Sequence, residues 1–178
     1  MNKRTKRILL VIGGALAVCL VVIAGLAWHV LNSFDKAFGE PYPHRPDAEM
    51  IRNFTEHRAD FERVRSMAQA DATISRIDED WTLPDNIDRE KVAEYRNLFR
   101  VIGTPRGLDQ RPALGEIDLI ASSLGWVASG STKGYTYVQT KPSRGLVVES
   151  LDDTHSLREL ETRYLKRIDD HWYLYFER

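Results

Sequence analysis

An uncharged stretch near the N-terminus, residues 8–28 from Ile8 to Trp28, constrains the chain more than any other feature. A helix of this length rises about 31 Å, which matches the ~30 Å hydrocarbon core of a bilayer. A helix also satisfies its own backbone hydrogen bonds, as a segment in lipid must. The stretch therefore predicts a transmembrane helix whose partner is the lipid bilayer.

The charges beside this segment predict its orientation. Lys3, Arg4, Lys6 and Arg7 give residues 1–7 a basic character, and no comparable cluster follows the apolar stretch. By the positive-inside rule, the N-terminus stays in the cytoplasm and the chain beyond about residue 31 is extracytoplasmic. We therefore expect a single-pass signal anchor.

Other interpretations of the segment stay open. Small residues at Gly25 and Ala27 fit a cleaved signal peptide, although the apolar run is longer than the usual core of about 7–15 residues. Lipidation at Cys19 is disfavoured by the bulky residue before it, and a buried soluble helix by the uncharged length. Gly13 and Ala17 form a small-xxx-small pair through which two such helices could pack in the membrane.

The rest of the chain is mildly acidic. The 178 residues include 25 Lys plus Arg and 26 Asp plus Glu. Residues 1–31 hold four of the basic residues and no acid, so residues 32–178 carry 21 basic and 26 acidic side chains, a net charge of −5. Without a basic stripe, nucleic-acid binding is not expected. The single cysteine excludes an intrachain disulfide and a cysteine-based zinc site.

A Pro-rich juxtamembrane spacer over residues 29–46 precedes a domain over residues 47–178. Apolar residues at helical spacing predict an amphipathic helix from Asp47 to about Ala70. A second helix is expected to be capped near Asp85 and stopped by Gly103. Its apolar stripe is Val92, Tyr95, Phe99 and Ile102.

From about Glu116 onward the apolar residues alternate as they do in strands. Extended runs are expected at residues 116–121, 126–128, 135–138, 146–148, 163–168 and 171–176, with a tight turn at 169–170. The predicted class is therefore α+β, in which two amphipathic helices pack on one face of an antiparallel meander sheet of about five or six strands.

Two stretches, STKGYTY at residues 131–137 and IDDHWYLYFE at residues 168–177, resemble a group of small bacterial envelope proteins with an N-terminal anchor. The likeness covers about residues 50–178. It implies a protein of the bacterial inner membrane whose domain faces the periplasm. It carries no catalytic residues and no activity.

The stretch GSTKG at residues 130–134 matches neither a phosphate-binding P-loop nor a serine–lysine enzyme motif. Its glycines predict a flexible hairpin loop, with an anion-binding site around Lys133 as the alternative.

The titratable residues suggest no catalytic set and no metal or cofactor site. His57 lies on the first helical stripe and is expected to be a partly buried core residue with a satisfied hydrogen bond. Glu149, Asp152, Asp153 and His155 form an acidic turn whose spacing matches no calcium loop. No Ser/His/Asp set can be chosen among the serines, and the run at residues 78–80 before Trp81 is expected to be a surface loop.

The aromatic residues of the predicted strands serve mainly as cross-strand pairs. On the face away from the helices, tyrosines would instead form an exposed patch able to bind protein or glycan. The candidate binding residues are Trp126, Lys133, Tyr135, Tyr137, Tyr173 and Tyr175.

Three functions fit these features. The first is a non-catalytic binding domain on a membrane anchor, for instance an immunity-type protein that protects against a periplasmic toxin. The acidic domain would favour a basic protein partner. The second is an envelope hydrolase using Glu149, Asp152 or Asp153. The third is a subunit of a membrane complex, contacted through Gly13 and Ala17.

Overall fold

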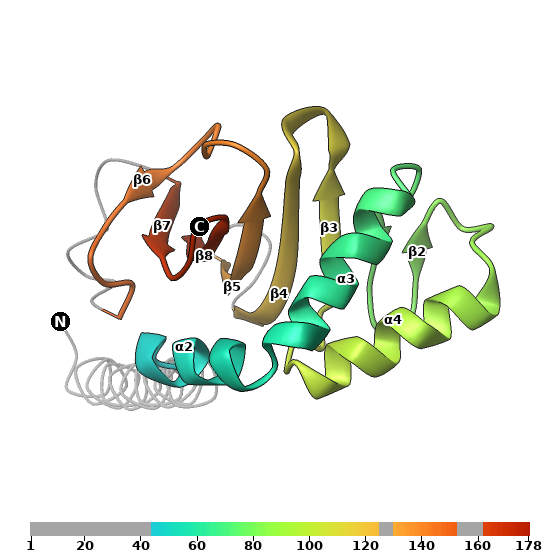
Figure 1. Cartoon of the computed structure of the whole chain (residues 1–178), viewed down its shortest axis with the longest axis horizontal. Coiled ribbons are helices and arrows are strands. Elements are labelled where there is room, and N and C mark those ends of the chain that lie inside the picture. The colour runs from blue at the N-terminus through green and yellow to red at the C-terminus, as the bar shows by residue number, and fades with distance from the viewer. Residues whose placement is uncertain (1–43, 125–129, 153–161) are drawn as a thin grey trace, which may run out of the picture. The chain divides into compact units, whose positions relative to one another are not determined.

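The computed structural model describes residues 44–124, 130–152 and 162–178. They belong to the second of two units of the chain, His44–Arg178. In this part of the chain, three α-helices accompany an eight-stranded sheet (Figure 1), so the predicted α+β class is confirmed. The predicted span at residues 8–28 lies outside the described residues. Among those described, no helix has the length and apolar character needed to cross a membrane.

The helices follow the predicted stripes with two changes. The first expected helix is two, α2 (Asp47–Glu56) and α3 (Arg58–Ala70), because the backbone leaves the helical region at His57, with φ −110° and ψ 24°. The half-buried His57 thus lies at a bend, with Asp60 3.7 Å from its ring, and is not a core residue. The expected stripe is nonetheless buried along both helices, at Met50, Phe54, Phe61, Val64 and Ala68.

The third helix, α4 (Arg89–Val101), begins later than expected. Its cap is Asp88, whose side chain accepts hydrogen bonds from the backbone N–H groups of Glu90 and Lys91. Asp85, the predicted cap, lies before it in an exposed segment. The predicted stop is confirmed, since Gly103 follows the helix with φ +67°.

The sheet differs from the predicted meander in strand count and connectivity. Its eight strands lie in the order β2-β1-β3-β4-β5-β8-β7-β6, and β6 pairs with β7 in parallel. The bounds are β1 (Arg76–Ile77), β2 (Thr82–Leu83), β3 (Leu108–Arg111), β4 (Glu116–Leu124), β5 (Ser131–Val138), β6 (Leu146–Val147), β7 (Arg163–Arg167) and β8 (Trp172–Glu177). A simple antiparallel meander would put β6 beside β5, but β8 takes that place.

The C-terminal hairpin of β7 and β8 is confirmed. The alternation of β8 sends Trp172, Leu174 and Phe176 into the main core with the helices. Tyr173 and Tyr175 join a second buried cluster on the opposite face, with Ile120, Val138 and Leu165. The middle of the sheet is therefore buried on both faces.

The GSTKG stretch is not a hairpin loop, because β5 runs through it from Ser131. Gly134 lies inside the strand and is required for close packing. A Cβ atom there would lie 2.2 Å from the Leu119 carbonyl oxygen and 2.8 Å from the Tyr175 ring. The glycine thus lets the Tyr175 ring and the neighbouring strand approach β5 closely, a role that differs from loop flexibility.

Candidate functional site

The tyrosines predicted to form a binding patch are mostly buried. Tyr135 is fully buried, and its hydroxyl donates to the Met50 carbonyl and accepts from the Asn53 amide. Tyr173 and Tyr175 lie in the second core cluster at 9% and 2% exposure. Tyr137 is half-buried, with the Arg65 guanidinium over its ring. At these described positions the tyrosines build the sheet and form no exposed patch.

The remaining candidates divide in two. Trp126, Gly13 and Ala17 lie outside the described residues. Lys133 is only 1% exposed, so it is a buried cation of β5. Its ammonium lies 2.8 Å from Asp47 Oδ1 and 2.9 Å from Asp152 Oδ1. These two carboxylates neutralise the charge that an anion ligand would need.

Asp47 anchors the start of α2 to the sheet. Its carboxylate also accepts from the Lys166 ammonium at 3.0 Å and from the Leu151 backbone N–H at 2.9 Å. Burial alone would raise the pKa of Asp47. The hydrogen bonds from Leu151, Lys133 and Lys166 outweigh burial and lower this pKa. The cluster is an internal tie between elements far apart in sequence.

A second polar cluster, which the spacing of the sequence does not reveal, surrounds His44. Its ring nitrogens lie 2.6 Å from Ser122 Oγ and 2.8 Å from Ser131 Oγ, on β4 and β5. Burial and the positive charge of Lys133 lower the pKa of His44 to about 4, so the ring is neutral. In the described residues no carboxylate orients this ring, and an imidazole of such low basicity is a weak general base. The cluster therefore ties the start of the domain to the sheet.

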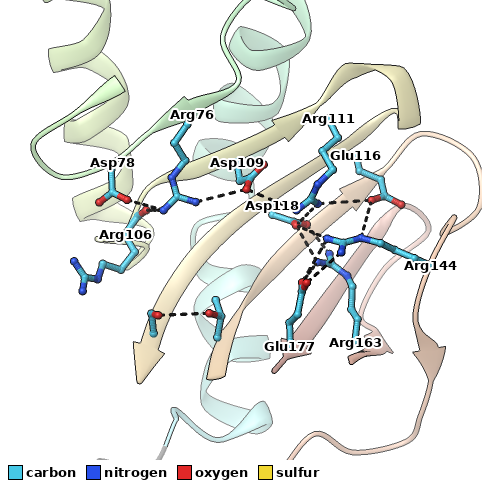
Figure 2. Close-up of polar contacts among 12 residues, drawn as sticks. Arg76, Asp78, Arg106, Asp109, Arg111, Glu116, Asp118, Arg144, Arg163 and Glu177 are labelled. Carbon is cyan, nitrogen blue, oxygen red and sulfur yellow. Dashed lines mark hydrogen bonds and ion pairs between the residues drawn. The ribbon is translucent and has the colours of Figure 1, made fainter. Parts of the chain in front are cut away.

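On the face of the sheet opposite the helices, charged side chains form a continuous network (Figure 2). We call it the ionic belt. Its members are Arg76, Asp78, Asp109, Arg111, Glu116, Asp118, Arg144, Arg163 and Glu177. They come from β1, β3, β4, β7 and β8 and from the segments after β1 and β5. The belt thus crosses much of the sheet.

Asp118 is the centre of the ionic belt, at 2% exposure. Arg163 donates to both of its carboxylate oxygens, at 2.6 and 2.9 Å, and Arg111 adds a third contact at 2.7 Å. Burial would raise the pKa of Asp118, but the hydrogen bonds and charge of Arg163 lower it instead. Because each acid here faces guanidinium groups, the belt does not offer the free carboxylate pair of a glycoside hydrolase.

At one end of the ionic belt, Arg76 lies against the exposed side chain of Trp81. Asp109 links Arg111 to Arg76, at 3.6 and 3.7 Å (Figure 2). Arg76 also binds Asp78 at 2.6 Å, and its guanidinium lies 5.6 Å from the centre of the Trp81 ring. Trp81 is 51% exposed. A large apolar side chain is thus held at the surface by charged groups that are themselves fixed.

Trp81 forms one side of a groove of about 480 Å³ between the β1–β2 hairpin and α4. We call it the Trp81 groove. Its lining comprises Asp80, Trp81, Thr82, Asp85, Ile87, Arg89, Val92, Ala93, Arg96, Asn97 and Arg100. The Arg96 side chain donates to the Asp78 carbonyl at 3.0 Å, so α4 also holds the hairpin in place.

The sequence alone does not reveal the groove, because the segments that line it are short and lie apart in the chain. The run at residues 78–80, expected to be a surface loop, begins with Asp78, which is 8% exposed and forms part of the ionic belt. Strands of two residues show no periodicity, so β1 and β2 leave no pattern. The arginines of α4 look like an ordinary solvated helix face.

Comparisons of the chain with protein-family models, with curated proteins and with solved structures find no match.

Proposed function

We propose that this chain is a non-catalytic binding module on a single-pass inner-membrane anchor, with its domain on the periplasmic side. The observation that carries the proposal is the half-exposed Trp81 beside a groove of about 480 Å³. Tryptophan and arginine dominate the residues that contribute most to protein–protein binding. The Trp81 groove combines both residue types.

The way Trp81 is held supports a binding role. Arg76 lies against its ring and is fixed by Asp78 and Asp109, while Arg96 secures the turn. A side chain that is already held in place, as Trp81 is, loses little conformational entropy when a partner binds. Such preorganisation is what a protein docking site needs.

The anchor predicted at residues 8–28 complements this site, since it would hold the groove near the outer face of the inner membrane. Partners would then be proteins that reach that surface. Immunity-type protection against a periplasmic toxin is one form of the proposal. Contact through Gly13 and Ala17 in a membrane complex is compatible with it.

The chemistry of the described carboxylates supports binding over hydrolysis. Of the predicted catalytic acids, Asp152 pairs with Lys133, and Asp153 lies outside the described residues. Glu149 is exposed. A glycoside hydrolase would need a pair of carboxylates that face each other. They stand far enough apart to hold a water molecule in inverting enzymes and about 5 Å apart in retaining enzymes.

The proposal is tested by site-specific photocrosslinking in cells that make the full chain. A benzophenone amino acid replaces Trp81 in one variant and Leu114 in the control. Leu114 is similarly exposed, at 48%, and lies outside the groove. We expect discrete crosslinked products from position 81 only. Equal crosslinking from both positions, or none from position 81, would contradict a docking role for the groove.

A further inference from the structure

No arginine of the Trp81 groove pairs with a carboxylate in the described part of the chain, whereas eight other described arginines do. Among the described residues, Arg89 contacts no carboxylate, Arg96 binds a carbonyl oxygen, and Arg100 binds the Asn97 side chain. By contrast, Arg58, Arg63, Arg65 and Arg167 pair with acids on the open surface. The groove therefore presents donors without anionic partners.

The position of these arginines on α4 makes them one surface. Residues 89, 96 and 100 are separated by seven and four positions, so they lie along one face of the helix. The lining holds only two acids, Asp80 and Asp85. The local charge is thus positive, although residues 32–178 carry a net charge of −5. Net charge alone predicts a basic partner, and the groove has the opposite sign.

We infer that the Trp81 groove takes an acidic peptide segment of a protein partner. This inference depends on the proposed function and specifies the partner's chemistry. Carboxylates of the segment pair with the guanidinium groups, which hold planar anions through two parallel hydrogen bonds. An apolar side chain of the segment packs on Trp81. Its acidic residues replace the missing partners of Arg89 and Arg100.

The test uses the full chain in nanodiscs of uncharged lipid and short fluorescent peptides. Three peptides alternate Val with Glu, Gln or Lys, and binding is followed by fluorescence anisotropy. We expect the Glu peptide to bind at least about tenfold more tightly than the Gln peptide, and the Lys peptide not to bind. Raising the salt should weaken binding, because the groove is open to solvent.

Alanine substitutions test whether the Glu peptide binds in the Trp81 groove. Arg89→Ala and Arg100→Ala should each weaken binding of the Glu peptide about three- to tenfold. Arg52→Ala is the matched control, because Arg52 is an exposed arginine of α2 outside the groove. Its affinity should equal that of the unmodified chain. Arg96 is left in place because it also supports the hairpin.

The outcomes separate the inference from the proposed function. No binding of the Glu peptide, no preference for it over the Gln peptide, or equal loss in the Arg52 variant overturns the acidic-segment inference. Preference for the Lys peptide, or binding to vesicles of anionic lipid instead of peptide, also overturns it. In each case crosslinking from position 81 would still support a docking groove. Absence of that crosslinking would refute the proposed function itself.

Discussion

Asp118 and Arg163 form a buried charged pair at the centre of the ionic belt. Both side chains are 3% exposed and share two parallel hydrogen bonds. Replacing such a pair by apolar residues can be neutral, but removing one member leaves a buried charge without its main partner. The pair is therefore sensitive to single substitutions.

Arg163→Ala should lower the free energy of unfolding by about 3–5 kcal/mol. Arg167→Ala, on the same strand, removes an ion pair with Asp170 whose side chains are 59% and 85% exposed, and should cost close to nothing. Denaturant unfolding followed by circular dichroism measures both. Similar losses in the two variants would show that the ionic belt is not desolvated.

His44 should make stability depend on pH. Its pKa is about 4 in the folded protein and its ordinary value is 6.5. Between these values the unfolded chain binds more protons, so the stabilisation is complete above pH 6.5 and falls as the pH drops toward 4. Allowing for its partial exposure, the loss is about 1–2 kcal/mol. Unfolding free energies measured across this pH range would detect it.

His44→Asn supplies the control for this pH effect. Other titrating groups, such as Asp47, are present in both proteins, so their contribution cancels when the two pH profiles are subtracted. The difference should follow a single group. If the profiles are parallel, His44 is not held neutral between Ser122 and Ser131.

At the scale of elements, substitutions can test which of two aspartates, Asp85 or Asp88, caps the start of α4. Asp88→Ala should destabilise the domain by about 1 kcal/mol, since it removes the acceptor for two backbone N–H groups. Asp85→Ala, at the cap predicted from the sequence, should have little effect on stability. Thermal unfolding of the two variants decides between them, and a larger loss from Asp85→Ala would contradict the observed cap.

Gly134→Ala tests the packing of β5. The added methyl group would meet the Leu119 carbonyl oxygen and the Tyr175 ring, so strands or ring must shift. We expect a loss of about 1–3 kcal/mol, as for an overpacked core. Thr132 lies on the same strand and is half-exposed, so Thr132→Ala should lower the free energy of unfolding by less. Denaturant unfolding of the two variants measures the difference. A harmless Gly134→Ala would support the flexible loop predicted from GSTKG.

Long periodic segments made the α+β class, the helical stripes and the C-terminal hairpin predictable. The stripes of α3 and α4 and the alternation of β8 each repeat several times, so local sequence identifies them. β1, β2 and β3 are two to four residues long and show too little alternation to be predicted, whereas β6 coincides with the run expected at residues 146–148. The candidate site could not be predicted either. Trp81 forms part of a groove only because the fold places it beside Arg76 and α4.

At the scale of the whole molecule, the predicted anchor sets where the groove would act. Protease added to spheroplasts should digest a C-terminal epitope tag and spare an N-terminal one, since the basic tail marks the cytoplasmic end. Immunoblotting of both tags gives the result. A protected C-terminal tag would refute the proposed orientation and remove the periplasmic partner from consideration.

The two outermost strands of the sheet, β2 and β6, are two residues long each. Long uncovered edges recruit strands from other molecules and lead to aggregation. Proteins tethered to one bilayer meet at high local density, where such recruitment is strongest. At the density that the predicted anchor would impose, the short β2 and β6 strands would offer neighbouring copies little unpaired main chain on which to add a strand.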